Sequence, residues 1–180
     1  MDWGSLNPRT GRRGAADGWY FVTLCTRRRE CFFGKVGDSR MRSSKIGNVA
    51  LGFWEEIPNH STNAGLDAFV IMPNHLHGIV IIKARNDPRS DVGACGGGDW
   101  GMTGASGTLN VPPGPGSLGA IVRSYKSAVT RWSRMNGYTS FAWQPRFYDR
   151  VIRDHTALQN IRRYILDNPA KWEQDRNLER

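Results

Sequence analysis

The sequence has few cysteines and no long run of apolar residues, and both absences narrow the class of protein. Its three cysteines (Cys25, Cys31 and Cys95) are odd in number and show no CxxC spacing, so we expect neither a disulfide framework nor a zinc knuckle. We instead expect reduced thiols in a cytoplasmic protein. Residues 1–17 are polar and lack the apolar core of a secretory signal, and no segment supplies the about 20 apolar residues of a membrane span.

Acidic residues are also scarce relative to basic ones. The chain has 16 Asp and Glu against 25 Lys and Arg, a formal net charge of +9 and a pI of about 10. Such a balance is typical of a protein that binds a polyanion, most often nucleic acid. At 180 residues the chain suits one hydrophobic core, so we predict a single domain over residues 1–180.

Hydrophobic periodicity divides most of the chain into strands and helices. Aromatic and β-branched residues predict strands over 19–27, 66–72, 75–83 and 143–152, the middle two joined by a turn at Pro73 and Asn74. Apolar residues at helical spacing predict helices over 43–59, from Ser117 to about Asn136, and from Asp154 or Thr156 to near Asn168.

Residues 84–116 interrupt this periodicity. They contain nine glycines and four prolines and almost no periodic apolar residues. A segment of this composition buries too little surface to offset the entropy lost on ordering. We therefore predict a flexible Gly/Pro-rich insertion at 84–116.

The order strand–helix–strand–strand–helix–strand–helix is typical of a ferredoxin-like α+β fold. We predict an antiparallel sheet of about four strands, with the helices packed on one face.

Two histidines stand one residue apart in the predicted strand at 75–83. His75 and His77 share a face because successive side chains of a strand point to opposite sides. Two imidazoles on a rigid element can hold a divalent metal with part of its coordination sphere open. Taken alone, such a pair is more often structural or a chance occurrence than a metal site.

The predicted C-terminal helix carries a phenol and a carboxamide on one stripe. Tyr164 and Asn168 are four residues apart and so face the same way, in line with the apolar Ala157 and Ile161. We expect this stripe to pack on the sheet near the histidines. The amide oxygen of Asn168 would suit a hard cation such as Mg²⁺ or Mn²⁺ as a third ligand.

Four motifs occur in order along the chain: MPNHLHGIV, AIVRSYKSAVTRW, WQPRFYDRVIR and YILDNPAKW. In this combination the chain resembles the REP-associated tyrosine transposases, which belong to the single-tyrosine HUH (His–hydrophobic–His) superfamily. The resemblance spans residues 19–172 apart from the insertion. It implies that His75, His77 and Asn168 bind the metal and that Tyr164, on the catalytic C-terminal helix, is the nucleophile.

The resemblance also implies a reaction and a partner. The reaction is metal-dependent cleavage and strand transfer of single-stranded DNA through a covalent 5′-phosphotyrosine intermediate. The partner is single-stranded DNA that contains a REP-like hairpin. Related transposases include monomers and homodimers, so both states remain open.

Basic and aromatic residues alternate near the predicted site. This pattern suits single strands, because bases stack on aromatic rings while arginines contact phosphates. The predicted DNA-binding residues are Arg27, Arg28, Arg29, Lys126, Trp143, Arg146, Tyr148, Arg150 and Arg153.

Three alternatives remain open. A non-catalytic binding module for structured single-stranded nucleic acid would use the same charge and aromatic residues, with a purely structural histidine pair. A metal-dependent hydrolase of small phosphoesters would need Asp67 or Asp149 beside the histidines. Within the transposase hypothesis, Tyr148 is the rival nucleophile.

Overall fold

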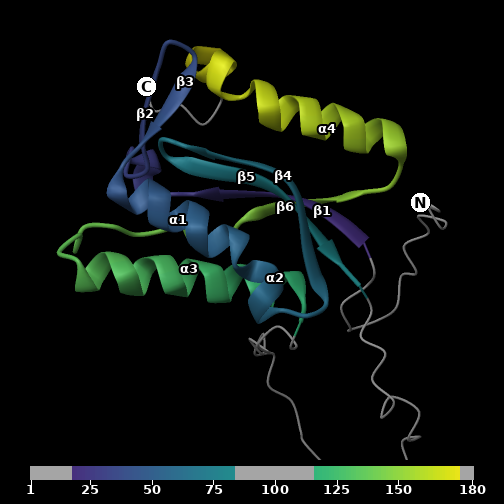
Figure 1. Ribbon diagram of the computed structural model, residues 1–180, viewed down its shortest axis with the longest axis horizontal. Helices are drawn as coiled ribbons and strands as arrows, with labels where there is room; N and C mark the ends of the chain where they lie inside the picture. Colours follow the sequence, from purple (N-terminus) through teal and green to yellow (C-terminus); the bar gives the residue numbers. More distant parts are fainter. Residues whose placement is uncertain (1–17, 84–115, 175–180) are drawn as a thin grey trace, which may run out of the picture.

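The main sheet forms where aromatic and β-branched side chains are dense in the sequence. The computed structural model describes residues 18–83 and 116–174 (Figure 1). Its main sheet consists of β1 (Gly18–Cys25), β4 (Ala64–Met72), β5 (His75–Ile82) and β6 (Tyr148–Ile152). The strand order is β4-β5-β1-β6, and all neighbouring strands are antiparallel. The predicted α+β fold with a four-stranded antiparallel sheet is confirmed.

The side chains of the central strand β1 alternate between two cores. Val22 and Leu24 point into the larger core, which is shared with α1 (Lys45–Glu55) and α3 (Leu118–Met135). Phe21 points the other way, into a smaller core shared with α4 (His155–Asp167). The sheet therefore has two apolar faces, and both must be covered.

The helices divide between these two faces. In Figure 1, α1, α2 (Ile57–His60) and α3 lie on one side of the sheet and α4 lies on the other. The prediction that the helices pack on one face is therefore correct for α1–α3 and wrong for α4. The physical reason is that Leu158 and Ile165 of α4 are buried against Phe21 and Ile79, which point away from α1 and α3.

Three helices begin at residues whose side chains cap them. The side chains of Ser44, Ser117 and Asp154 accept hydrogen bonds from the backbone N–H groups of Gly47, Ala120 and Ala157, at 3.1, 3.3 and 2.7 Å. Each bond satisfies an N–H that the helix itself cannot pair.

The structure also differs from the sequence prediction elsewhere. The helix predicted over 43–59 is divided into α1 and α2. A hairpin of β2 (Gly34–Gly37) and β3 (Arg40–Ser43) was not predicted. The predicted strand at 143–152 is regular only over β6, and Trp143 makes an isolated bridge to Thr26. Pro145 has no backbone N–H to donate to a neighbouring strand, and Arg146 adopts a φ of 64°. These two residues interrupt the extended conformation between Trp143 and the start of β6.

The remaining elements are short. Residues Arg27–Arg29 form the 3-10 turn η1, and Pro169–Gln174 form η2 after α4. The predicted insertion at 84–116 lies, apart from Gly116, outside the described residues. Within 18–83 and 116–174, no helix has the length and apolar character needed to cross a membrane.

Candidate active site

The two histidines lie side by side on the face of the sheet that α4 covers. His75 and His77 are both 0% exposed, and their ring centroids are 4.4 Å apart. Leu76, between them, points into the opposite core. The predicted common face of the histidine pair is therefore confirmed.

The tautomer of His75 is set by the residue before it. The buried Asn74 donates from Nδ2 to the carbonyl oxygen of Arg29 at 2.9 Å, which turns its Oδ1 toward His75 Nδ1 at 2.8 Å. An amide oxygen only accepts hydrogen bonds, so Nδ1 of neutral His75 carries the proton. Its Nε2 then bears the lone pair, which is the form in which an imidazole binds a metal.

His77 is oriented by groups on both of its ring nitrogens. Thr23 Oγ1 lies 2.9 Å from Nδ1, and the Tyr164 hydroxyl lies 3.1 Å from Nε2. The ring also stacks on Phe21, with centroids 5.4 Å apart. The sheet thus fixes the imidazole rigidly, with one nitrogen turned toward the predicted nucleophile.

Asn168 lies between two contacts that bring the end of α4 onto the histidines. Tyr164, four residues earlier, reaches His77, while the Trp172 ring, four residues later, stacks on His75 at 6.0 Å. Asn168 is 3% exposed, and its Oδ1 is buried without a hydrogen-bond partner among the described residues. A buried, unsatisfied carbonyl oxygen is costly unless something binds it.

The imidazole nitrogens of His75 and His77, together with the amide oxygen of Asn168, fit a divalent metal. Within the described part of the chain no cluster of three or more His, Cys, Asp or Glu side chains is arranged to hold one, so a site here depends on the amide. Two imidazoles and one amide oxygen suit Mn²⁺, and Mg²⁺ less closely because that ion prefers all-oxygen ligands.

An ion pair between Asp67 and Arg162 holds α4 against the edge strand β4. The β4 pairing shifts register between Leu66 and Phe69, and this bulge turns Asp67 toward α4. There Arg162 donates from Nε and NH2 to the two Asp67 carboxylate oxygens at 2.8 and 2.6 Å. The hydrogen bond from Arg162 is the main reason that the pKa of Asp67 is lowered. Arg162 is two residues from Tyr164, so the pair fixes the helix close to the hydroxyl.

Edge strand β6 pairs with β1 on the side away from β5 and extends the face of the sheet that carries the histidines. Tyr148 lies opposite Thr23 in the β1–β6 pairing, and Arg150 lies opposite Phe21. Tyr148 is 52% exposed and is one strand further from His77 than Thr23 is. The rival nucleophile thus lies at the rim of the site, whereas Tyr164 contacts a histidine.

A basic cavity of about 390 Å³ opens between β1 and the segment before β6. We call it the site cavity; it is lined by Thr23, Cys25, Arg29, Gln144, Pro145, Arg146, Phe147 and Tyr148. Thr23 and Cys25 stand opposite His77 and His75 in the strand pairing, so the cavity adjoins the histidine pair.

The other predicted DNA-binding residues are distributed unevenly. Arg27 and Arg28 of η1 and Arg153 after β6 are exposed. Trp143 instead packs among Phe33, Phe141 and Tyr125 and donates from its indole to the backbone of Lys126. Lys126 donates to two backbone carbonyls, and partial burial lowers its pKa. Both residues lie on the α3 side of the sheet, away from the histidines.

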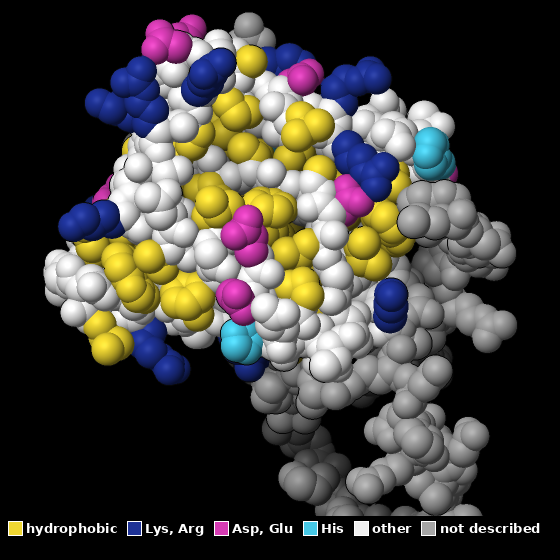
Figure 2. Space-filling model, in the orientation of Figure 1, with side chains coloured by type: hydrophobic (Ala, Val, Ile, Leu, Met, Phe, Trp, Pro, Cys, Tyr) yellow, Lys and Arg dark blue, Asp and Glu magenta, His cyan; other side chains and the backbone are white. Residues whose placement is uncertain are grey.

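Basic side chains also surround the face seen in Figure 2. Hydrophobic side chains occupy much of the centre of that face, with acidic side chains among them. Lys and Arg gather along its rim, most densely near the β2–β3 hairpin. The hairpin contributes Lys35, Arg40 and Arg42, of which Arg42 pairs with Asp38 at 3.0 Å.

Sequence reasoning missed the residues that orient the site. Thr23 contacts His77, and Asn74 contacts His75. The Asp67–Arg162 pair holds the helix that carries Tyr164. Only Asn74 had a local signal, because it directly precedes His75. The strand register and the bulge that place Thr23 and Asp67 have no comparable signature.

Comparison with known proteins agrees with the fold. No family model matches the chain. A solved structure of a REP-associated tyrosine transposase bound to a REP hairpin has a TM-score of 0.56 to this chain, with 18% identity over 90% of this chain and 73% of that one. At that identity the likeness shows the fold alone. An uncharacterized protein of Haemophilus influenzae is 34% identical over 171 residues, which cover 89% of this chain and 84% of that protein. The chain therefore belongs to the same family as this Haemophilus influenzae protein.

Proposed function

We propose that the protein is a metal-dependent tyrosine transposase that cleaves single-stranded DNA beside a hairpin and rejoins it. The observation that carries the proposal is the 3.1 Å contact between the Tyr164 hydroxyl and Nε2 of His77, within a pair of buried histidines. A tyrosine that only packs in a core does not need two histidines on a common face. The alternative is a module that binds structured single-stranded nucleic acid without cutting it.

The residues that would hold the metal are His75 and His77 through Nε2 and Asn168 through Oδ1. The Asn74 amide supports this assignment, because it leaves the lone pair of His75 on Nε2. When bound, a divalent cation supplies positive charge that stabilises the scissile phosphate as negative charge develops on it.

Tyr164 would be the nucleophile. Its oxygen forms a bond to the phosphorus, the bond from phosphorus to the 3′ oxygen breaks, and the DNA strand leaves as a 3′ hydroxyl. The phenolic proton is lost and the leaving oxygen gains one, so the step is balanced. Attack of a 3′ hydroxyl on the phosphotyrosine reverses the reaction and rejoins strands without ATP. Tyr164 is 39% exposed, which leaves room for a strand to reach it.

An unperturbed phenol needs help at neutral pH. With a pKa of about 10, about one phenol in a thousand is ionised at pH 7, a deficit of roughly 4 kcal/mol. If His77 held the metal through the lone pair of Nε2, that nitrogen would not accept a hydrogen bond from the Tyr164 hydroxyl, 3.1 Å away. The Tyr164 hydroxyl would then be oriented by the substrate instead of by the imidazole.

The exposed edge beside the site supplies surfaces for a strand. Arg150 and Tyr148 share the face of the histidines, and Arg29 and Arg146 line the site cavity. Arginines contact phosphates, while an exposed tyrosine ring offers about 1–3 kcal/mol of stacking with a base. The fold neighbour was solved bound to a REP hairpin, which makes a DNA hairpin the natural candidate substrate.

The hydrolase alternative has little support. Asp67 is engaged by Arg162, and Asp149 is exposed on β6 opposite Val22, on the other face of the sheet. Neither carboxylate is available beside the histidines to complete the metal site of a small-phosphoester hydrolase.

Denaturing electrophoresis tests the proposal. Purified protein is incubated with labelled single-stranded DNA from the flanks of its gene, with Mn²⁺ or with chelator. We expect an SDS-resistant protein–DNA adduct that needs Mn²⁺, disappears in Tyr164→Phe and persists in the matched variant Tyr148→Phe. An adduct that persists in Tyr164→Phe and is lost in Tyr148→Phe would move the nucleophile, whereas binding without any adduct would favour the binding module.

A further inference from the structure

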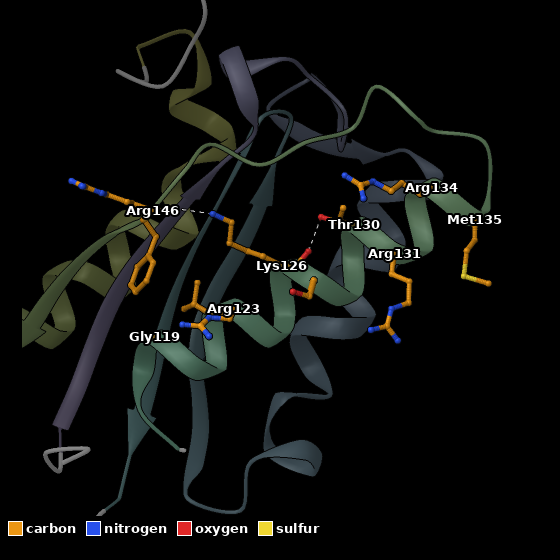
Figure 3. Close-up of a pocket in the computed structure, with 11 residues that line it drawn as sticks. Gly119, Arg123, Lys126, Thr130, Arg131, Arg134, Met135 and Arg146 are labelled. Carbon is orange, nitrogen blue, oxygen red and sulfur yellow. Dashed lines mark hydrogen bonds between the residues drawn. The ribbon is translucent and has the colours of Figure 1, made fainter. Parts of the chain in front are cut away.

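A second basic cavity lies along α3, on the face of the sheet opposite the histidines. It has a volume of about 730 Å³, and we call it the α3 groove. Its charged lining residues are Arg123, Lys126, Arg131, Arg134 and Arg146, and no acidic residue lines it. Figure 3 shows these side chains distributed along α3, with Arg146 on the neighbouring segment.

The positive charge of the α3 groove is not balanced locally. Residues 117–148 contain five Lys and Arg and no Asp or Glu. The four arginines of the lining are exposed, so their guanidinium groups are available to an outside anion. Arginine at this density and exposure is suited to phosphate, which it binds with two parallel hydrogen bonds.

The length of the groove indicates a polymer rather than a single phosphate. Arg123 and Arg134 are eleven positions apart on one helix, which corresponds to about 16 Å at 1.5 Å per residue. Phosphates of one strand of a duplex follow at about 3.4 Å along its axis, so several of them fit this span. Phe147 is the one aromatic residue in the lining. Backbone contacts without stacking platforms favour duplex DNA over single strands.

The segment before β6 joins the α3 groove to the site cavity beside the histidines. Arg146 and Phe147 line both the α3 groove and the site cavity beside Thr23. Lys126 fixes this segment by donating to the carbonyl oxygens of Gln144 and Arg146 at 2.7 and 2.9 Å. The two cavities therefore meet around the β6 edge of the sheet.

We propose that the α3 groove binds the phosphate backbone of a DNA duplex stem. The adjoining single strand would then pass around the β6 edge, across Arg146, to the site cavity and Tyr164. The choice of DNA as the polyanion rests on the proposed function. In this arrangement Lys126 is a positioning residue for the segment that both parts of the DNA contact.

Fluorescence anisotropy tests the proposal with two probes: a labelled DNA hairpin with a single-stranded extension, and the same extension without its stem. The test variant is Arg123→Gln with Arg134→Gln. The control is Lys45→Gln with Lys83→Gln, which removes the same charge from exposed positions elsewhere. We expect the test variant to lose about tenfold or more in affinity for the hairpin and to reduce the salt slope by about 2, or about 0.9 per lost phosphate contact. Its affinity for the stemless strand and the behaviour of the control are expected to match wild type.

Three results would overturn the proposal: unchanged hairpin affinity, an equal loss in the control variant, or an equal loss for the stemless strand. The readout is binding and needs no cleavage. If wild type forms no Tyr164 adduct with either probe, the proposed function fails while the α3 groove is still tested. If the adduct forms but hairpin affinity does not depend on Arg123 and Arg134, the proposed role of the α3 groove is wrong and the proposed function stands.

Discussion

Thr23 and His77 lie opposite each other in the β1–β5 pairing, with Thr23 Oγ1 2.9 Å from His77 Nδ1. Thr23→Val keeps the shape of the side chain and removes the hydroxyl that orients the ring. Loss of a group that orients a metal ligand typically costs about 10–100-fold in metal affinity, and we expect a loss of this size for Mn²⁺ by isothermal titration calorimetry. Thr23→Ser retains the hydroxyl and is expected to bind as wild type does. Equal Mn²⁺ affinities of the Thr23→Val variant and wild type would show that Thr23 does not orient a metal ligand.

Asn168 offers the second test of the metal site. Asn168→Ala removes the buried Oδ1, whereas Asn168→Asp replaces it with a charged oxygen that hard cations prefer. We expect weaker Mn²⁺ binding in the first variant and retained or tighter binding in the second, measured by electron paramagnetic resonance of unbound Mn²⁺. Identical affinities in both variants and wild type would show that Asn168 is not a ligand.

The Asp67–Arg162 pair predicts a pH-dependent part of the stability. Arg162 lowers the pKa of Asp67, so the stabilisation is present above the unfolded pKa of about 3.9 and is lost as the pH falls through the lower folded pKa. Hydrogen bonds to charged groups contribute about 1.5–3 kcal/mol, and the side chains of Arg162 and Asp67 are only 27% and 16% exposed. We expect Asp67→Asn to lower the free energy of unfolding by about 1–3 kcal/mol at pH 7, with a difference that shrinks in acid.

Urea denaturation at several pH values measures this difference. Asp38→Asn is the control, because its pair with Arg42 is 87% and 64% exposed and such pairs contribute little. A pH-independent deficit in Asp67→Asn would assign the effect to packing instead of the ion pair.

Gly78 predicts a packing cost. It follows the histidine pair on β5, and a Cβ added there would lie 2.5 Å from the indole of Trp54 in α1. Overpacking of this kind costs about 1–3 kcal/mol, so we expect Gly78→Ala to lower the melting temperature clearly. Gly52→Ala is the matched control: it lies within α1 with nothing within 4 Å of the added Cβ, and alanine is favoured in a helix by up to about 1 kcal/mol. A neutral Gly78→Ala would mean that Trp54 can move.

Local patterns predicted the elements that carry the site. Alternation in a strand was enough to place His75 and His77 on one face, and helical spacing was enough to put Tyr164 and Asn168 on one stripe. Capping chemistry, which acts within three residues, predicted a helix start at Ser117 and another at Asp154 or Thr156. The observed caps are Ser117 and Asp154.

What could not be predicted depends on contacts between distant segments. Thr23 and His77 are 54 positions apart, and only the strand register brings them together. The bulge that turns Asp67 toward Arg162 has no signature in its own sequence. The side of the sheet taken by α4 follows from which face of β1 and β5 remains apolar after α1 and α3 have packed, a property of the assembled sheet.

The helix that carries Tyr164 is fastened by the smaller of the two cores. Among the residues that the structure describes, five buried ones form that core, against sixteen in the core beneath α1 and α3. The Asp67–Arg162 pair supplements the smaller core. Stability in a protein is distributed unevenly, and weakly buried elements open before the rest unfolds. The candidate active site is therefore expected to be lost by local opening of α4 while the sheet and its other helices remain native. Mild heat or dilute denaturant would then abolish the proposed DNA cleavage in a molecule whose global fold still persists.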